Sequence, residues 1–421
     1  MGAIIGMAQD YVGSNNINIL QPNGQFGTRN ENGKDSASPR YIWTKLEKLS
    51  TIIFNSDDTP ILNHQTDDGL PIEPEYYGPI IPMILINGAE GIGTGFSTKI
   101  PPYNPLDIIN NLKLLIKGKE LNQLEPWWQK FEGTVKKIDN YNYEIYGNWE
   151  IKNNKLIITE LPVGEATSSY KAFLEKMLDD EPSKTKAKVK KENPLISYTS
   201  NNTDTKVYFE LTFQDGYLDK FNDNNSYELL KLMHLVKKYS ITNMHLYNSK
   251  GTIQKYDNVE DIMKDYYTIR LGLYQKRKDY QLEILEHQLE LISWKVKFIL
   301  MVIEKKLEIN NKMRDAIEEA LVKNKFPKLG INKDTKPSYD YLLSMPIYNL
   351  TFEKIEELKK QLCDKQTEYN ELKDKSINKI WLEELNLLAE EYKVFYQNKL
   401  DEMDNVPSTN KNNSKRKSKK N

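Results

Sequence analysis

The longest regular pattern in the chain is a stripe of apolar residues that recurs every three or four positions from Val259 to Ile303. This spacing predicts a long amphipathic helix that needs a partner helix along its apolar face. A second stripe of the same period, from Ile355 to Leu372, can supply that partner. The two stripes predict an antiparallel helical stalk, although a static coiled-coil scaffold would give the same pattern.

Patterns typical of strands lie before the long stripe. Apolar and polar residues alternate within 141–147, 155–162 and 206–213, which predicts strands of a mixed α/β region. The continuously apolar run Ile80–Ile86 predicts a buried strand. Apolar residues at helical spacing predict a helix over Tyr41–Phe54, with the tyrosine in its first turn. The predicted fold class is therefore α+β with several domains.

Composition narrows the class of protein. The chain has 421 residues, of which 38% are hydrophobic and 28% charged, which allows two or three domains. It contains no run of eighteen apolar residues and no basic signal-peptide segment at its start, so no membrane partner is expected. One cysteine, Cys363, excludes an internal disulfide and indicates a reducing compartment. The four histidines lack zinc-site spacing, so no metal ligands are predicted.

The charge balance alone leaves the partner open. The net charge is −1, so a nucleic-acid partner would require clustered basic residues. Two such clusters occur, Lys184–Lys191 and Lys411–Lys420. Each is more often a solvated loop or tail than a binding site when it is considered in isolation.

The segment 21–44 carries chemistry that the periodic segments lack. It is polar, contains three glycines and has no regular period until Tyr41. Loops of this length are usually functional or disordered, and apolar segments on both sides argue against disorder. Tyr41 directly follows Arg40. A phenol titrates near pH ~10 and attacks poorly at neutral pH unless a base or a positive charge assists it. The guanidinium can hold a phosphate oxygen and stabilise developing charge, whereas the alternative is a surface tyrosine on a basic loop.

A second glycine-rich loop, Asn87–Gly95, follows the apolar run. It has neither the Gly-Lys-Ser/Thr of a P-loop nor the Gly-x-Gly-x-x-Gly spacing, so a nucleotide site is not expected. Its glycines permit close backbone approach to DNA and leave one apolar side chain, Ile92, projecting. An apolar wedge between base steps kinks DNA. A core position is the alternative for Ile92.

Both loops together resemble one protein family. The resemblance is carried by AQDYVGSNNINILQPNGQFGTRNENGKDSASPRYIWT followed by PIIPMILINGAEGIGTGFSTKIP, which is similar to the breakage-reunion region of eukaryote-type DNA topoisomerase II, a type IIA topoisomerase. Two long motifs in the same order are far more specific than one short pattern. The resemblance implies that Tyr41 forms a phosphotyrosine link to the 5′ end of cut DNA, that Arg40 assists, and that Ile92 inserts into the duplex. Further DNA contacts are expected from Gln25, Arg29, Lys34, Lys45 and Lys99.

The resemblance covers roughly residues 3–398 and implies a domain order. Residues Ile4–Tyr11 would be a helix of an incomplete winged-helix domain. The implied parts are a partial winged-helix breakage-reunion domain (1–100), an α/β tower domain (101–257), an ascending coiled-coil helix (258–305), a helical exit-gate knob (306–350), a return coiled-coil helix (351–398) and a disordered basic tail (399–421).

Partners and cofactors are also implied by the resemblance. We expect double-stranded DNA and a second copy, joined through the exit gate, as partners. ATP and Mg²⁺ would serve the complete enzyme and be bound by ATPase and toprim domains outside this chain. We therefore expect a fragment or split gene product, inactive alone, that works with a separate chain in a nucleus or a cytoplasmic viral factory. A non-catalytic DNA-bending and dimerisation module, or a structural coiled-coil protein, is the alternative.

Overall fold

The computed structural model describes residues 1–179, 194–221, 226–332 and 335–404. These residues form two compact units of mixed α and β structure, which confirms the predicted fold class. Of the described residues, the first unit comprises those within 1–56, 79–269 and 384–404, and the second comprises those within 57–78 and 270–383. Both predicted basic clusters, Lys184–Lys191 and Lys411–Lys420, lie outside the described residues. None of the helices in the described part is long and apolar enough to span a bilayer.

The first unit begins with short helices and a hairpin. These are α1 (Gly2–Ala8), the 3-10 turn η1 (Pro39–Tyr41), α2 (Lys48–Ile53), α3 (Met83–Asn87), β3 (Ala89–Gly93), β4 (Phe96–Ile100) and α4 (Pro105–Ile116). Helix α1 ends three residues before the predicted Tyr11, because the backbone of Gln9 is already extended. Helix α4 is capped by Asn104, whose side chain accepts a hydrogen bond from the Leu106 amide at 2.9 Å.

Two predictions for this region are wrong. The helix predicted over Tyr41–Phe54 is confined to α2, which starts at Lys48 where the Glu47 side chain accepts the Lys48 amide at 2.8 Å. Tyr41 is therefore not in a helix first turn, and a helix dipole does not act on it. The run Ile80–Ile86 is not a strand, because its second half forms α3. A short, uninterrupted apolar run fits either a strand or a helix, and its period alone does not separate the two.

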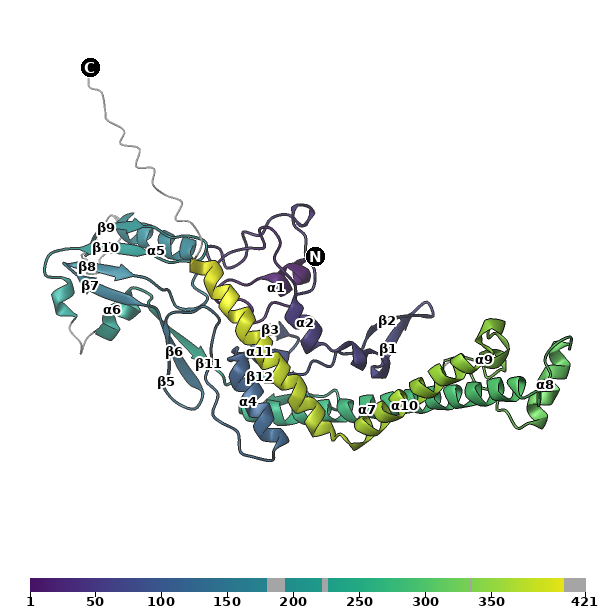
Figure 1. Ribbon diagram of the computed structural model, residues 1–421. Coiled ribbons are helices and arrows are strands. Elements are labelled where there is room, and N and C mark those ends of the chain that lie inside the picture. Colours follow the sequence, from purple (N-terminus) through teal and green to yellow (C-terminus); the bar gives the residue numbers. More distant parts are fainter. Residues whose placement is uncertain (180–193, 222–225, 333–334, 405–421) are drawn as a thin grey trace, which may run out of the picture. The chain divides into compact units, whose positions relative to one another are not determined.

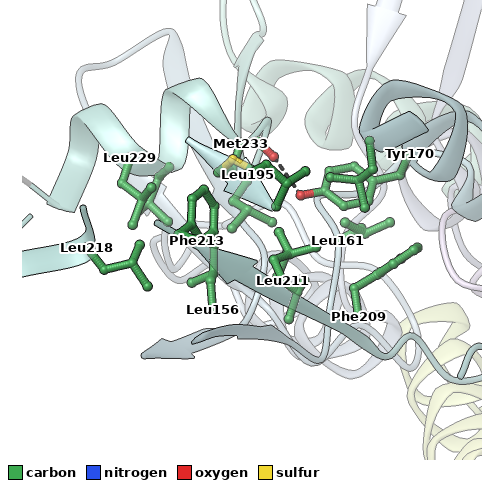
Figure 2. Packing of buried hydrophobic residues seen from close by; sticks show 14 of the residues in the cluster. Leu156, Leu161, Tyr170, Leu195, Phe209, Leu211, Phe213, Leu218, Leu229 and Met233 are labelled. Carbon is green, nitrogen blue, oxygen red and sulfur yellow. Dashed lines mark hydrogen bonds between the residues drawn. The ribbon is translucent and has the colours of Figure 1, made fainter. Parts of the chain in front are cut away.

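A four-stranded antiparallel sheet forms the largest core of the first unit. Its strand order is β7-β8-β10-β9, with β7 (Trp149–Lys152), β8 (Lys155–Ile158), β9 (Leu195–Ser200) and β10 (Phe209–Phe213). Figure 2 shows Leu156, Leu211 and Phe213 packing beneath helices α5 (Thr167–Asp179) and α6 (Ser226–Leu232). The Tyr170 hydroxyl, buried in this core, donates to the Met233 carbonyl at 2.9 Å. The predicted strands within 155–162 and 206–213 are confirmed.

Two smaller sheets complete the first unit. The order of the three-stranded sheet is β11-β6-β5, with β5 (Thr134–Lys137), β6 (Asn142–Tyr146) and β11 (Val236–Ser240), which confirms the predicted strand within 141–147. Strands β12 (Met244–Tyr247) and β13 (Ile253–Tyr256) form an antiparallel pair. The short 3-10 turn η3 (Leu218–Lys220) lies between β10 and α6.

The second unit is organised around two antiparallel helices, α7 (Val259–Ile303), which starts in the first unit, and α10 (Phe352–Asp374). They lie side by side in Figure 1. Their reverse order is fixed by contacts: Lys278 Nζ donates to the Lys373 carbonyl at 2.8 Å, and Tyr369 donates to Glu286. The predicted helix from Val259 to Ile303 is confirmed.

The tip of this helical pair has its own core. Leu291, Phe298 and Ile299 of α7 pack with Ile355 and Leu358 of α10. Short elements complete it: α8 (Arg314–Lys323), α9 (Asp340–Leu343) and η4 (Ile347–Asn349). The return segment is not one helix, because α10 ends at Asp374, and α11 (Ile377–Asp404) follows after an extended Lys375. The six-part domain division stays a prediction.

The second unit also contains η2 (Ser56–Ile61) and the hairpin β1 (His64–Asp67) and β2 (Leu70–Pro74). His64 Nδ1 lies 2.9 Å from the Ile72 carbonyl oxygen, and Nε2 lies 3.1 Å from that of Thr59. Because carbonyl oxygens only accept hydrogen bonds, the doubly protonated ring satisfies both contacts. These hydrogen bonds raise the pKa of His64 above its usual value.

A buried charge cluster lies in the same unit. Asp58 is 2% exposed, and its carboxylate lies 2.8 Å from Arg270 and 3.4 Å from Arg277. Both guanidiniums also lie over the ring of the buried Tyr274, at 4.2 and 4.6 Å from its centre. The cluster therefore ties η2 to helix α7 through desolvated charges.

Candidate nucleic-acid interface

The loop that carries Tyr41 is closed at its base by pairing between its two ends. Isolated antiparallel bridges join Leu20 to Leu46 and Asn23 to Trp43. The Trp43 amide donates a hydrogen bond of 3.2 Å to the Asn23 carbonyl. The two ends of the loop therefore lie next to each other.

Contacts inside the loop fix its shape. The Thr28 amide and hydroxyl donate to the Asp35 carboxylate at 2.8 and 2.6 Å. Gly27 and Gly33 both have positive φ, and a Cβ on Gly27 would lie 2.6 Å from Gly33 Cα. Glycine is therefore required where these two turns cross. The Gln9 side chain donates to the Gly33 carbonyl at 3.1 Å, which ties the crossing to the segment after α1.

Tyr41 ends the 3-10 turn η1 on the outer surface of the loop. Its amide donates to the Ser38 carbonyl at 2.9 Å, and the residue is 70% exposed. The central carbon of the Arg40 guanidinium lies 4.8 Å from the centre of the Tyr41 ring, and Arg40 is exposed as well. A solvent-accessible phenol beside a guanidinium can reach a phosphodiester while a cation stays close to the developing charge.

The second glycine-rich loop forms the β3–β4 hairpin, and Ile92 projects from it. Ile92 pairs with Ser97 in the hairpin register and is 93% exposed, which excludes the core alternative. The hairpin is held from β12 and the residue before it. The Lys99 amide donates to the Asn243 carbonyl at 2.7 Å, and the Asn243 side chain donates to the Ser97 hydroxyl. An apolar side chain is thus presented on a supported hairpin.

The segment that contains both loops lies within the region matched by one family model. The model describes the A-type subunit of DNA gyrase/topoisomerase IV, and it matches residues 1–386.

The chain belongs to the DNA gyrase/topoisomerase IV A-subunit family.

Close relatives within this family are named DNA topoisomerase 2. DNA topoisomerase 2 of Acanthamoeba polyphaga mimivirus is 42% identical over 92% of this chain and 35% of that protein. DNA topoisomerase 2 of Saccharomyces cerevisiae is 38% identical over 94% of this chain and 30% of the yeast protein. The chain therefore spans about a third of the length of these curated relatives.

A solved structure agrees with the sequence comparison. The crystal structure of the Plasmodium falciparum topoisomerase II DNA-binding, cleavage and re-ligation domain matches with a TM-score of 0.83 at 37% identity. The match covers 96% of this chain and 56% of that one. The fold of this family member is thus that of a topoisomerase II cleavage domain.

The predicted contact residues of this family member do not all lie at the surface. Gln25, Lys34 and Lys45 are exposed on the tyrosine loop. Lys99 is half-buried in β4, where its ammonium lies 3.4 Å from the Glu90 carboxylate and 4.7 Å from the centre of the Tyr239 ring. Lys99 therefore already has intramolecular partners.

Arg29 is placed differently from the sequence expectation. It is 4% exposed, and its guanidinium donates to the Glu160 carboxylate at 2.6 Å. Glu160 also accepts the Leu161 amide at 2.8 Å. In this position the guanidinium is withdrawn from the surface, and its ion pair anchors the tyrosine loop to the segment after β8. The sequence offers no local signal for this, because the two residues are 131 positions apart.

Sequence reasoning also missed Trp43. The hydrophobic pattern assigns it only to the apolar segment after the loop, yet it is 64% exposed, and Leu46 is 59% exposed. In the structure, exposed and half-buried residues alternate from Tyr41 to Lys45, as expected of an extended segment, but the apolar pattern of the sequence does not show this alternation. A helical interpretation of the same residues hides it.

The resemblance implies that Mg²⁺ serves the complete enzyme and is bound by a domain outside this chain. Within the described ranges no three histidine, cysteine, aspartate or glutamate side chains gather closely enough to hold a metal ion. These residues do not fit a Mg²⁺ site, and no step of the chemistry below is assigned to a metal bound by them.

Proposed function

We propose that this chain is the DNA breakage-reunion portion of an ATP-dependent type IIA topoisomerase, which cuts both strands of a duplex through phosphotyrosine links and passes a second duplex. The observation that carries this proposal is the exposed Tyr41 phenol beside Arg40 on a loop fixed by internal contacts. Relatives named DNA topoisomerase 2 match nearly the whole chain. The relatives support the class of reaction, and the exposed phenol beside Arg40 supports Tyr41 as the reacting residue.

The chemical step is a transesterification at phosphorus. The Tyr41 oxygen loses its proton and attacks the phosphorus atom, the P–O3′ bond breaks, and the leaving 3′ oxygen takes up a proton. The 5′ phosphate stays attached to Tyr41. Arg40 holds a non-bridging phosphate oxygen and stabilises the added charge in the transition state. Because the ester keeps the energy of the broken bond, the reverse attack by the 3′ hydroxyl reseals the strand without ATP.

DNA bending at the hairpin supports strand opening in this proposal. Ile92 inserts between base steps, which costs a few kcal/mol of unstacking and is offset by the contacts that a bent duplex makes. Its 93% exposure leaves the whole side chain available for this contact. Gln25, Lys34 and Lys45 contact the DNA backbone beside the tyrosine.

A pair of chains supplies the two cuts. The residues around η4 expose large apolar side chains: Ile347 is 84%, Tyr348 78% and Phe352 64% exposed. We propose that this surface joins two copies as the exit gate. ATP and Mg²⁺ are required by the complete enzyme and are bound outside the described residues. The 421 residues alone are expected to bind duplex DNA without cutting it.

The second candidate is a non-catalytic DNA-bending and dimerisation module. The exposed Ile92 and the apolar surface around η4 favour it, because neither feature requires the tyrosine to react. It predicts bent DNA and paired chains, and it predicts that Tyr41 never becomes linked to DNA.

A hybrid enzyme distinguishes the breakage-reunion proposal from the non-catalytic module. These residues replace the matching segment of the mimivirus DNA topoisomerase 2, and the hybrid is incubated with Mg²⁺ and end-labelled duplex DNA. The breakage-reunion proposal predicts that 3′-labelled fragments migrate with protein and 5′-labelled fragments migrate freely. Tyr41→Phe should abolish the adduct, whereas Tyr247→Phe, at a residue that is 73% exposed, should leave it intact. A hybrid that bends DNA and forms no adduct supports the second candidate.

A further inference from the structure

The chain after the reactive turn exposes every second residue. Tyr41, Trp43 and Lys45 are exposed, whereas Ile42 and Thr44 are half-buried. Ile42 has φ −125° and ψ 155°, an extended conformation in which successive side chains point to opposite faces. The phenol, the indole and the ammonium group therefore lie along one outer face.

The inner face of this segment is fixed against the other side of the loop. A Cβ on Gly24 would lie 2.9 Å from Ile42 Cγ2, so the two residues are in close contact. The Thr44 hydroxyl donates to the Gln21 carbonyl at 2.7 Å. Together with the Trp43 amide bond to Asn23, these contacts keep the indole turned outward. These backbone contacts account for the outward direction of the indole, which is 64% exposed.

The surroundings of the indole define the partner. Tryptophan is usually highly buried, so a largely exposed indole on a fixed face is available for binding. The exposed charged residues nearest to Trp43 along the chain are both cationic: Arg40 precedes it and Lys45 follows it. Cations combined with a flat aromatic face fit a nucleic acid, because the phosphates are anionic and bases and sugars offer flat surfaces for packing.

We propose that Trp43 is a DNA-contacting residue that packs against the sugar or base of the nucleotide one or two steps from the phosphate that Tyr41 attacks. Two residues of extended chain span about 6.6 Å, and one nucleotide step rises about 3.4 Å along the duplex. Trp43 holds the cut 5′ end while Tyr41 is esterified, so that the 3′ hydroxyl remains in line for resealing. This inference rests on the proposed function only for the identity of the attacked phosphate.

Photocrosslinking of the full 421-residue chain tests the contact without requiring cleavage. Duplexes carry 5-iodo-deoxyuridine at successive positions around a preferred site, and the bound complexes are irradiated. Trypsin cuts after Arg40 and Lys45, so that one peptide, residues 41–45, carries both Tyr41 and Trp43. We expect a nucleotide crosslinked to Trp43 from one or two adjacent positions and from none further away.

Affinity measurements supply the matched variants. Trp43→Ala should weaken duplex binding by about 5- to 150-fold, the effect of losing one stacked aromatic group. Trp43→Phe keeps an aromatic face and should stay within about threefold of the parent chain. The fluorescence difference between the parent and Trp43→Phe isolates the signal of this one indole among six tryptophans, and duplex DNA should quench it.

The outcomes separate this inference from the proposed function. The absence of a Trp43 crosslink at every position, together with unchanged affinity of Trp43→Ala, overturns the inference whatever Tyr41 does. A Trp43 signal that changes only when other parts of the enzyme are added identifies a protein interface and also overturns it. A Trp43 crosslink in a hybrid whose Tyr41 is never esterified leaves the aromatic contact standing and removes the proposed function.

Discussion

The ion pair between Arg29 and Glu160 makes the sharpest prediction about how the tyrosine loop is held. The two side chains are 5% and 3% exposed and 2.6 Å apart. Glu160→Ala removes the carboxylate and leaves the Arg29 guanidinium buried. Glu160 also accepts the amides of Leu161 and Glu132, at 2.8 and 3.4 Å, and these donors lose their acceptor as well.

The expected loss of stability in Glu160→Ala follows from the burial of both side chains. Breaking a buried ion pair by removing one partner costs about 3–5 kcal/mol, because the other charge stays desolvated. Replacing both partners, as in Arg29→Met with Glu160→Leu, removes both charges. That double variant still leaves the Leu161 amide without its acceptor, at about 1–3 kcal/mol. We therefore expect the double variant to be less destabilised than either Glu160→Ala or Arg29→Ala.

Native-state hydrogen exchange is the suitable assay. The chain forms two units, so that a single global unfolding free energy is not well defined, whereas exchange reports local opening. The Gly33 amide, which donates to the Thr28 carbonyl at 2.8 Å, reports on the loop. Its protection should fall strongly in Glu160→Ala and recover in large part in the double variant.

A surface pair provides the control. Lys152 and Glu150 are also 2.6 Å apart, but they are 63% and 47% exposed. Glu150→Ala should therefore change local stability by at most about 1 kcal/mol. The reasoning is refuted if Glu160→Ala costs no more than this control, or if the two single effects simply add in the double variant.

Three further predictions concern other parts of the chain. Ile92→Ala should reduce DNA bending, measured by fluorescence energy transfer across the duplex, and leave the fold unchanged. The control Ile138→Ala, at a residue that is 57% exposed, should leave bending unchanged. Equal bending by the two variants would show that Ile92 does not insert into the duplex. Asp58→Ala should lower the local stability of the second unit by about 3–5 kcal/mol, because two buried guanidiniums lose this carboxylate. Native-state hydrogen exchange of amides in α10 measures this loss, and a value below about 1 kcal/mol would contradict the prediction. The raised pKa of His64 means that its contribution to hairpin stability is complete below the unfolded value near pH ~6.5 and is lost as pH rises through the folded value. NMR titration should show this pKa above ~6.5, and a value at or below it would refute the two-carbonyl arrangement.

The parts of the fold that were predictable from sequence have strong local periodicity. The ascending helix predicted over 258–305 corresponds closely to α7, because apolar residues at helical spacing recur along most of its 45 residues. The run Ile80–Ile86 was misassigned because an uninterrupted apolar run has no period that separates a strand from a helix. The first half of the helix predicted over Tyr41–Phe54 is absent because Trp43 and Leu46 pair with Asn23 and Leu20, and this pairing overrides the local helical spacing.

The candidate site was predictable only in part, because contacts between residues far apart in the sequence override local patterns. Sequence reasoning proposed Tyr41, Arg40 and Ile92, and all three are exposed in the structure. The sequence did not indicate which cationic residues of the loop are buried and which are exposed. Arg29 is buried and paired with the carboxylate of Glu160, which is 131 positions away in the sequence, whereas Lys34 on the same loop is exposed. Such pairing depends on tertiary contacts that have no local pattern.

The most direct test of the central claim is the mass of the tryptic peptide 41–45 from the hybrid enzyme after cleavage with Mg²⁺ and nuclease digestion. The account predicts a nucleotide attached through phosphate to Tyr41, absent from the Tyr41→Phe variant. Cut DNA with Tyr41 unmodified, or with the nucleotide on another tyrosine, would contradict it.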